Sequence, residues 1–288
     1  MRLENVNKVF VYGTLRQHES NHSLLKNARC VSRQCWTNGI LYDTGFGYPA
    51  LLTSANNRVY GEVYEVSDQQ LKSLDVLEGY EGKGKENLYE RTTQVVHTDF
   101  DTIKAYVYVY SSSNATDLNE MKLGDWKCHR YLQQNELLYF AYGSCMDDER
   151  FQLAGVKHEF ERVAGCGVAK NYSLAYTRKA QDGGRADLIE SAEYTEGKVY
   201  HISKEALTYL YQREGVNARI YRPAFIDLTI DGKTYLNVLT FLVVDKAEEV
   251  APPMHYVTEI LRGAKGFVSE RYYQKLVGDL REKFGINE

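Results

Sequence analysis

The sequence predicts an α+β protein built from two tandem domains, each a small, mixed, mainly antiparallel β-barrel with helices at its rim. Three observations support this prediction. The chain has 288 residues, enough for two domains of average size. Sequence motifs recur at a fixed spacing, and each copy combines strand patterns with an amphipathic helix pattern. The 24 tyrosines also favour a sheet-rich protein, because tyrosine fits half-buried strands.

Composition and charge exclude several classes of partner. The formal net charge is −4 and no block of Lys or Arg occurs, so we expect neither nucleic acid nor an anionic membrane as a partner. The N-terminal stretch MRLENVNKVF has no apolar core of signal-peptide length, and no segment approaches the roughly 18 apolar residues of a spanning helix. A cytoplasmic protein is therefore expected. The five cysteines form no CxxC pair and are odd in number, which favours free thiols.

The chain repeats itself. VFVYGTLR at 9–16 and LYFAYGSCM at 138–146 are both apolar runs that end in Tyr-Gly-Thr or Tyr-Gly-Ser. Residues 60–80 and 196–216 then match without a gap at a spacing of 136. The matched pairs include Gly61 with Gly197, Val63 with Val199, Tyr64 with Tyr200, Ser67 with Ser203, and Glu78-Gly79 with Glu214-Gly215. The two copies are therefore expected to share one fold.

A third correspondence follows in each copy and sets the expected domain boundaries. Two β-branched and aromatic runs around a turn predict paired strands at 88–110 and again at 220–244. We place the first domain at 1–115 and the second at 137–288. The connector is placed at 116–136. Residues 111–117, at its start, are polar and turn-like, and residues 126–138, at its end, are interpreted as a short helix or an extended segment.

Each copy has the same expected order of elements. An apolar strand stops at the YGT or YGS turn, whose unpaired amides form a ready anion cradle. A second strand, GEVYEV or GKVYHI, leads to Ser67 or Ser203, which we predict to be the N-cap of an amphipathic helix. Each helix ends in Glu-Gly, with the glycine placed as a left-handed C′ residue.

The helix-end glutamates, Glu78 and Glu214, are the candidate acid/base residues. The helix C-terminus carries partial negative charge, so the dipole and any burial both raise the pKa of a carboxyl group there. A solvent-facing position beside a C-cap glycine is the alternative. The recurrence of the same residue in both copies favours a functional role.

The tail belongs to the second copy only. It is interpreted as two helices broken around Gly263 and Gly266, with Ser269 as the N-cap of the second.

These motifs resemble the γ-glutamylcyclotransferase-like family. VFVYGTLR, GYPALL, VYGEVYEV, LDVLEGY and YER are similar to its γ-glutamylamine-cyclotransferase-like branch, over nearly all of residues 7–110. YFAYGSCM, GRADLIESAEYTEGKVYHIS, REGV, IYRPA, the Gly-Ala pair and the closing helix resemble the glutathione-type enzymes over about 137–285. The resemblance implies two tandem domains of the family's small mixed barrel and a small-molecule γ-glutamyl substrate.

The resemblance also assigns roles to residues. It makes Glu78 and Glu214 catalytic. The residues implied to bind substrate are Tyr12, Gly13, Thr14, Leu15 and Tyr89 in the first copy, and Tyr142, Gly143, Ser144, Cys145 and Tyr221 in the second. Cys145 departs from the pattern, because the family commonly has Asn at that position.

The implied reaction is intramolecular. The α-amine of the substrate attacks its own γ-carbonyl, which closes a five-membered lactam, 5-oxoproline, and expels an amine. A carboxylate that takes one proton and returns another is sufficient, so we expect no metal or other cofactor.

Two other functions remain open at this stage. Cys145 is a candidate nucleophile for a thiol acyl-transferase or amidase, with His129 and His158 as the nearest histidines in sequence. The second open function is that of a non-catalytic module that binds an amino-acid-like ligand. A metal site at His18, His22, Cys128 and His129 is not expected, because these residues are scattered. The leaving amine, the active copy and the oligomeric state cannot be read from the sequence.

Overall fold

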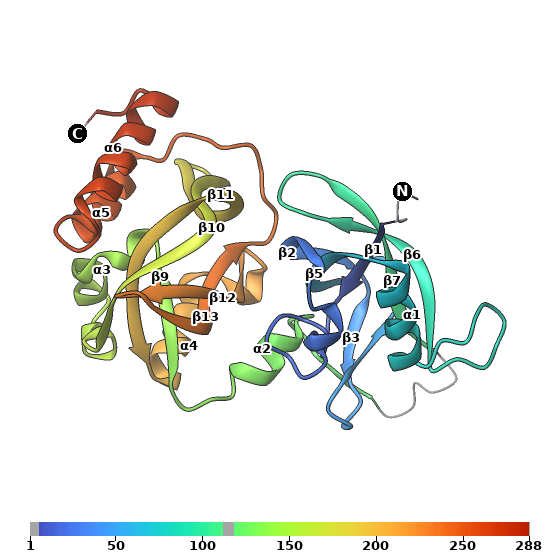
Figure 1. Ribbon diagram of the computed structural model, residues 1–288. Coiled ribbons are helices and arrows are strands. Elements are labelled where there is room, and N and C mark those ends of the chain that lie inside the picture. The colour runs from blue at the N-terminus through green and yellow to red at the C-terminus, as the bar shows by residue number, and fades with distance from the viewer. Residues whose placement is uncertain (1–5, 112–117, 288) are drawn as a thin grey trace. The chain divides into compact units, whose positions relative to one another are not determined.

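The computed structural model describes residues 6–111 and 118–287, and the chain divides into two compact units, Met1–Tyr131 and Leu132–Glu288 (Figure 1). Each unit holds a closed five-stranded barrel with helices within the described residues, which confirms the α+β barrel prediction. The turn expected at 111–117 lies outside the described residues apart from Ser111. The sequence-based boundaries at 115 and 137 stay a prediction.

The first barrel has the strand order β1-β5-β2-β6-β7 and closes where β7 meets β1. Its strands are β1 (Asn7–Val11), β2 (Arg29–Asn38), β5 (Arg58–Val66), β6 (Tyr89–His97) and β7 (Thr102–Tyr110). The β1–β7 pair is parallel and the other neighbouring pairs are antiparallel. A separate sheet in this unit pairs β4 (Pro49–Leu52) and β8 (Asn119–Glu120) with the central β3 (Ile40–Asp43).

The second barrel repeats this topology. Its strands are β9 (Leu137–Ala141), β10 (Val163–Ala180), β11 (Gly183–Ile202), β12 (Tyr221–Ile230) and β13 (Lys233–Val243). They follow the order β10-β11-β9-β13-β12, with β12 pairing back onto β10, and the β9–β13 pair is again parallel. When β9 is equated with β1 and β11 with β5, the two cyclic orders are identical, as expected for two copies of one fold.

The repeated helices begin where the sequence predicts. Helix α1 (Asp68–Leu77) is capped by Ser67 and α4 (Lys204–Arg213) by Ser203, each serine accepting a hydrogen bond from a backbone amide of the first turn. The expected tail helices are α5 (Met254–Ala264) and α6 (Glu270–Phe284), with Ser269 as the α6 N-cap. The remaining helices are η1 (His22–Leu25), α2 (Trp126–Tyr131), η3 (Ser144–Met146), α3 (Asp148–Leu153), η4 (Lys157–Phe160) and η5 (Val216–Ala218).

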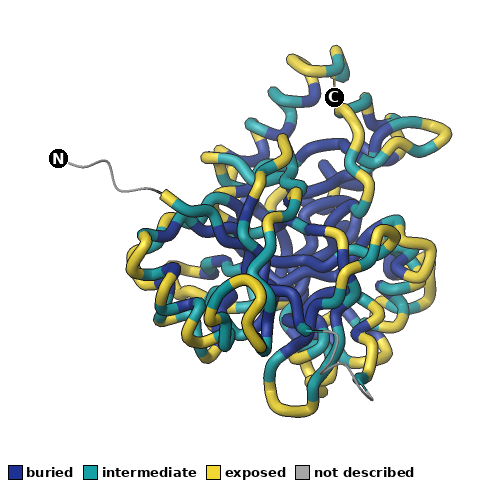
Figure 2. The backbone as a smooth tube through the Cα atoms, turned by 90° about the vertical axis from the view of Figure 1, so that its right-hand side faces the viewer, coloured by how far each residue is buried: buried dark blue, intermediate teal, exposed yellow. Residues whose placement is uncertain are grey.

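The strands of the first barrel bury side chains on both faces: one cluster includes Phe10 and Val63, and the other includes Val9 and Tyr64 together with Leu74 of α1. Figure 2 shows buried residues concentrated along the interior strands and exposed residues in the outer loops. The repeated glycines have a steric cause. A Cβ atom on Gly61 would lie 2.3 Å from the carbonyl oxygen of Val11, and one on Gly197 would lie 2.2 Å from that of Ala141. Both barrels therefore need glycine at this position, where β5 passes the end of β1 and β11 passes the end of β9.

A buried ionic network holds the connector helix α2 against the first barrel. Arg16 donates to the Glu62 carboxylate at 3.2 Å and to Asp125 at 2.8 Å. Lys127 Nζ lies 3.5 Å from Glu62 Oε1, and all four side chains are at most 5% exposed. Because Arg16 follows the YGT turn directly, this network also fixes that turn.

Within residues 6–111 and 118–287, no helix is long and apolar enough to cross a membrane.

Candidate active sites

Both candidate glutamates occupy the C-cap of their helix. Glu78 caps α1 and Glu214 caps α4, and each donates its backbone amide to carbonyl groups of the preceding turn. The following residues, Gly79 and Gly215, have φ angles of +60° and +62°. This is the left-handed region that favours glycine, which confirms the C′ prediction. The chain reverses there, and the glutamate side chain is left at the mouth of a cavity.

The first cavity, of about 130 Å³, lies in the first unit. All six residues that the sequence assigned to this copy line it: Tyr12, Gly13, Thr14, Leu15, Glu78 and Tyr89. The other lining residues are Phe10, Val11, Asn21, Tyr48, Pro49, Leu77, Leu88 and Tyr108. Glu78 is therefore the single ionisable carboxylate among the described lining residues, and it stands in a mostly apolar and aromatic wall.

This environment controls the charge of Glu78. Burial raises the pKa of the Glu78 carboxyl group to about 8, because a low-dielectric setting disfavours the charged form. Among the residues that the structure describes, none donates a hydrogen bond to this carboxylate. Glu78 is thus free to exchange a proton with a bound molecule near neutral pH.

The YGT turn offers backbone donors beside this carboxylate. The Arg16 amide donates to the Gly13 carbonyl at 3.0 Å, which closes the turn, and Asn21 Nδ2 donates to Thr14 Oγ1 at 3.0 Å. The amides of Thr14 and Leu15 have no acceptor among the described residues. Unpaired backbone amides at a cavity are suited to bind an anion or a developing oxyanion.

The predicted tyrosines form the walls of both cavities. Tyr12 donates its hydroxyl to the Tyr108 carbonyl at 2.6 Å, and Tyr89 donates to the Pro49 carbonyl at 2.7 Å. In the second unit the matching bonds run from Tyr142 to Phe241 at 2.5 Å and from Tyr221 to Ala186 at 2.8 Å. Since each hydroxyl proton is used internally, these side chains shape the cavities and can only accept a hydrogen bond from a ligand.

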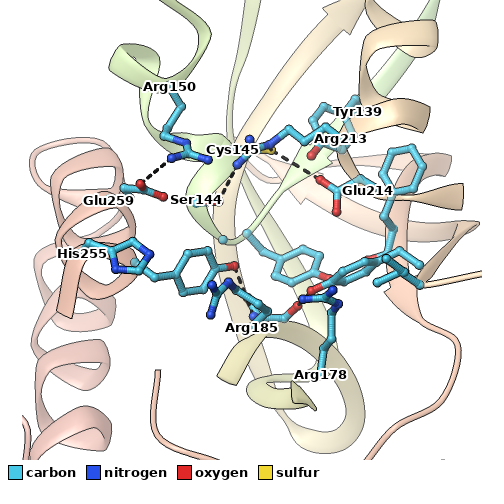
Figure 3. A pocket seen from close by; sticks show the side chains of 17 residues that line it. Tyr139, Ser144, Cys145, Arg150, Arg178, Arg185, Arg213, Glu214, His255 and Glu259 are labelled. Carbon is cyan, nitrogen blue, oxygen red and sulfur yellow. Dashed lines mark hydrogen bonds and ion pairs between the residues drawn. The ribbon is translucent and has the colours of Figure 1, made fainter. Parts of the chain in front are cut away.

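The second cavity, of about 240 Å³, lies in the second unit (Figure 3). The six residues predicted for this copy line it: Tyr142, Gly143, Ser144, Cys145, Glu214 and Tyr221. Sequence reasoning missed its other charged residues, which are Arg150, Arg178, Arg185, Arg213, His255 and Glu259. Arg213 could have been found from the sequence, because it directly precedes Glu214. The other charged residues come from α3, β10, β11 and α5, and no local sequence pattern indicates that they share a cavity.

Cys145, at the position where Asn is common, contacts the glutamate. Its Sγ lies 3.6 Å from Glu214 Oε1 and accepts a hydrogen bond from Arg213 Nε at 3.2 Å. Arg213 also donates to Ser144 Oγ at 2.9 Å, so it links the YGS turn to the helix end. Burial raises the pKa of Glu214, while Arg213, the Cys145 hydrogen bond and Arg178 oppose that shift.

The thiol alternative lacks its expected base. Neither His129 nor His158 is among the described residues that line the cavity of Cys145. His129 Nε2 lies 3.3 Å from Asp43 Oδ2, and His158 Nε2 lies 3.3 Å from Glu159 Oε1. Burial raises the pKa of the Cys145 thiol, which favours the protonated, unreactive form. All five cysteines are free thiols. Within the described parts of the chain, no group of three His, Cys, Asp or Glu residues is placed to hold a metal ion.

Comparisons with known proteins identify the family. A family model described as "Gamma-glutamyl cyclotransferase, AIG2-like" matches residues 9–128, and one described as "AIG2-like family" matches residues 195–276. The Bacillus subtilis strain 168 protein YkqA is 41% identical over 93% of this chain and 95% of its own length. Its crystal structure superposes with a TM-score of 0.86, at 40% identity, over 96% of this chain and 98% of that chain.

A second relative is named for its substrate. The gamma-L-glutamyl-butirosin B gamma-glutamyl cyclotransferase of Niallia circulans is 45% identical over 42% of this chain and 76% of its own length. The two family matches in tandem, the full-length relative and the repeated Glu-Gly helix ends agree with one another. The chain therefore belongs to the AIG2-like gamma-glutamyl cyclotransferase family.

Proposed function

We propose that the protein releases 5-oxoproline and an amine from γ-glutamyl amides, with Glu78 and Glu214 as the acid/base of their respective cavities. The observation that carries the proposal is the carboxyl group of Glu78. It is half-buried, has a pKa raised by desolvation to about 8, receives no hydrogen bond from a described residue, and shares its cavity with unpaired loop amides. Family membership supplies the substrate class, since cyclotransfer of a γ-glutamyl group is what the matched description names.

The reaction proceeds without a covalent enzyme intermediate. The substrate's α-amine attacks its γ-carbonyl carbon, forming the ring C–N bond, and the bond from that carbon to the leaving nitrogen breaks. The glutamate accepts the proton that the attacking amine loses and returns it to the leaving nitrogen, so the side chain ends as it began. Because nucleophile and electrophile belong to one molecule, correct placement alone lowers much of the barrier.

The turn amides have a separate role in this proposal. As the amine attacks, negative charge develops on the γ-carbonyl oxygen. The amides of Thr14 and Leu15, and their counterparts at Ser144 and Cys145, are the available donors for it. The enclosing tyrosines exclude water and keep the γ-glutamyl chain folded toward ring closure.

The test is a product assay. Release of 5-oxoproline from a panel of γ-glutamyl amides is measured for the wild type, Glu78→Gln, Glu214→Gln and the double variant. Loss of the proton acceptor should lower turnover by about 10² to 10⁴-fold while substrate still binds. The matched control is Glu81→Gln, which changes an exposed glutamate three residues after Glu78 that does not line the cavity.

The activities of these variants show which of the two units is catalytic. Loss in one single variant identifies the working cavity, and loss only in the double variant shows that both cavities turn over. If the double variant keeps full activity, the glutamate mechanism is wrong. If the wild type binds γ-glutamyl amides but yields no product from any of them, the protein is a ligand-binding module.

A further inference from the structure

The residues beside the two candidate glutamates differ between the units. At the spacing of 136 that relates the two helix ends, Leu77 of α1 corresponds to Arg213 of α4. Directly after the YGT or YGS motif, Leu15 corresponds to Cys145. Both leucines line the first cavity, and both Arg213 and Cys145 line the second. A pair of apolar residues at one glutamate is thus replaced by a pair of polar residues at the other.

In the second cavity the polar pair is bonded together and to the glutamate (Figure 3). Arg213 Nε donates a hydrogen bond to Cys145 Sγ at 3.2 Å, and the Cys145 thiol donates to Glu214 Oε1 at 3.6 Å. A second nitrogen of the Arg213 guanidinium donates to Ser144 Oγ at 2.9 Å, which holds the guanidinium against the YGS turn. Guanidinium, thiol and carboxylate therefore form a chain of hydrogen bonds in which each group donates toward Glu214.

This chain of hydrogen bonds requires a protonated thiol. Burial raises the pKa of the Cys145 thiol, although Arg213 opposes the shift, so the sulfur keeps its proton. A thiol is a weak donor by itself. Its bond to Glu214 is strengthened because the same sulfur accepts a hydrogen bond from a cation, and hydrogen bonds in a chain polarise one another.

Leucine at these two positions can supply neither bond. Desolvation is the cause that raises the pKa of Glu78 to about 8 in the first cavity. At Glu214 desolvation also raises the pKa, while Arg213, the Cys145 hydrogen bond and Arg178 all lower it. The two glutamates therefore occupy matching positions in different electrostatic surroundings.

We propose that Arg213, acting through Cys145, is a positioning residue of the second cavity, which orients the Glu214 carboxylate and stabilises its charged, proton-accepting form. Arg213 acts through the glutamate in this role, and the glutamate exchanges the proton. The catalytic consequence rests on the proposed function: the second cavity should work at lower pH than it would with the leucines of the first unit.

Four tyrosines also face Glu214, and they remain neutral. Burial raises the pKa of each hydroxyl group, so none of them adds a charge near neutral pH. They are Tyr139 of β9, Tyr142 of the YGS turn, Tyr221 of β12 and Tyr256 of α5.

The other charged groups of the wall have counter-charges of their own, apart from Arg178 of β10. Arg150 lies 2.6 Å from Glu259 Oε1, Arg185 lies 2.7 Å from Asp182 Oδ1, and His255 Nε2 lies 3.7 Å from Asp182 Oδ2. Arg178 contributes to the charge around Glu214 but is not joined to it by a hydrogen bond within the described part of the chain. Its contribution stays in place when Arg213 is replaced, so Arg213 variants isolate the effect of the bonded pair.

The charge of Glu214 is measured directly by NMR. In the full chain carrying Glu78→Gln and isotopically labelled glutamate, the side-chain carboxyl carbon of Glu214 is followed across pH. Its signal is identified by its loss when Glu214→Gln is added. Arg213→Leu should raise the pH at which Glu214 is half ionised by about one unit or more, because an adjacent opposite charge typically shifts a carboxyl pKa by about 1–3 units.

Two further variants test the path through the thiol. Cys145→Leu should raise the same midpoint by a smaller amount, because the guanidinium remains while the hydrogen bond to Glu214 is lost. Arg213→Lys keeps the charge but not the forked geometry that reaches both Cys145 and Ser144, so it should retain part of the effect. Thermal denaturation checks that each variant is folded, and Arg213→Gln replaces Arg213→Leu if the leucine variant does not fold.

A control and a reciprocal exchange complete the design. Gln212→Leu changes the exposed neighbour of Arg213 on α4, which does not line the cavity, and should leave the midpoint of Glu214 unchanged. In a chain carrying Glu214→Gln, the pair Leu77→Arg and Leu15→Cys should lower the midpoint of Glu78 below about 8. Leu77→Arg alone, at a position that is 37% exposed, should give part of that decrease.

Activity gives a second readout. In the chain carrying Glu78→Gln, the pH profile of kcat/KM for 5-oxoproline release should move to higher pH in Arg213→Leu by the amount that NMR measures for Glu214. A merely structural role for Arg213 would lower stability or the maximum rate without moving the profile.

The outcomes separate this inference from the proposed function. A midpoint of Glu214 that does not move in Arg213→Leu overturns the inference, even if that variant is less stable. If the midpoint moves as expected and neither the wild type nor any variant releases 5-oxoproline, the enzymatic proposal fails and the role of Arg213 at Glu214 stands. If the chain carrying Glu78→Gln releases 5-oxoproline with a pH profile that Arg213→Leu does not shift, the enzymatic proposal stands and the inference falls.

Discussion

The backbone amide of Tyr89 donates a hydrogen bond to the carbonyl oxygen of Glu78 at 3.2 Å, and Tyr221 makes the same bond to Glu214 at 3.3 Å. Each bond ties the first residue of a barrel strand to the last turn of a helix. The glutamate is therefore held by main-chain geometry that both copies reproduce. At Glu78 no described side chain bonds to the carboxylate, whereas at Glu214 the Cys145 thiol lies 3.6 Å from Oε1.

The raised pKa of Glu78 predicts the pH dependence of the first cavity. A base must be ionised to accept a proton, so in a chain carrying Glu214→Gln, kcat/KM should rise with pH up to about 8, where Glu78 is half ionised. The measurement is 5-oxoproline release across this range. A rate that is constant between about pH 6 and pH 8 would contradict the assignment.

The same pKa predicts a change in stability with pH. The folded chain binds the Glu78 proton more tightly than the unfolded chain does, since the folded pKa of about 8 exceeds the ordinary value of 4.5. The stabilising contribution of the proton is complete below that ordinary value and is lost as the pH rises through about 8. Glu78→Gln imitates the protonated form, so its Tm should match the wild type in acid and exceed it in mild alkali. A Tm difference that does not change with pH would show that the carboxyl group is not buried.

Gly79 and Gly215 have positive φ angles, so replacing either should lower the free energy of unfolding. Gly79→Ala should destabilise the chain by about 1–2 kcal/mol, because a Cβ atom is unfavourable at positive φ. Gly215→Ala should cost more, since its Cβ atom would lie 2.8 Å from Ile220 Cδ1, whereas a Cβ atom on Gly79 would lie 3.1 Å from Leu88 Cβ. Denaturant unfolding measures both. Equal costs would mean that Ile220 moves aside without penalty.

The local parts of this architecture could be predicted from the sequence, and the reason is visible in particular residues. Ser67, Ser203 and the two Glu-Gly helix ends carry their signals within a few residues, and the structure has them where expected. The paired strands β6 and β7, which are rich in β-branched and aromatic residues, were also predicted. Local chemistry decides these elements, so local patterns reveal them.

The elements that the sequence did not predict depend on distant contacts. Strands β2 and β10 contain register shifts against their neighbours, which interrupt the period of two that marks a strand. The charge of the second cavity was also missed, because Arg178 and His255 come from separate elements and meet only after folding. Arg16 ends the VFVYGTLR motif, and nothing in its local sequence indicates that its guanidinium bonds to Asp125 beside the connector helix.

That ionic network makes Arg16 a position of large expected cost. Arg16→Met would leave Glu62 and Asp125 buried, with Lys127 as the remaining cation at 3.5 Å from Glu62. Removing one partner of such a network typically costs about 3–5 kcal/mol. Denaturant unfolding should show this loss. The control is Arg29→Met, which removes an exposed partner of Glu65 and should cost about 1 kcal/mol or less.

Gly61 and Gly197 test whether both barrels need the same close approach between two neighbouring strands. Gly61→Ala would place its Cβ atom 2.3 Å from the Val11 carbonyl oxygen, and Gly197→Ala would place it 2.2 Å from that of Ala141. Those oxygens belong to the strands that end at the YGT and YGS turns, so they cannot move without displacing the turn. Each substitution should cost about 1–3 kcal/mol or more and should reduce binding in its own cavity.

The control for these two variants is Gly278→Ala in α6. A Cβ atom there has nothing within 4 Å, and the residue lies inside a helix. Alanine is the better helix former, so this variant should be more stable by about 0.5–1 kcal/mol. Denaturant unfolding separates the two classes. If Gly61→Ala and Gly197→Ala were as stable as Gly278→Ala, the neighbouring strands would be able to separate at the turns. Close packing would then not explain why glycine occurs at this position in both copies.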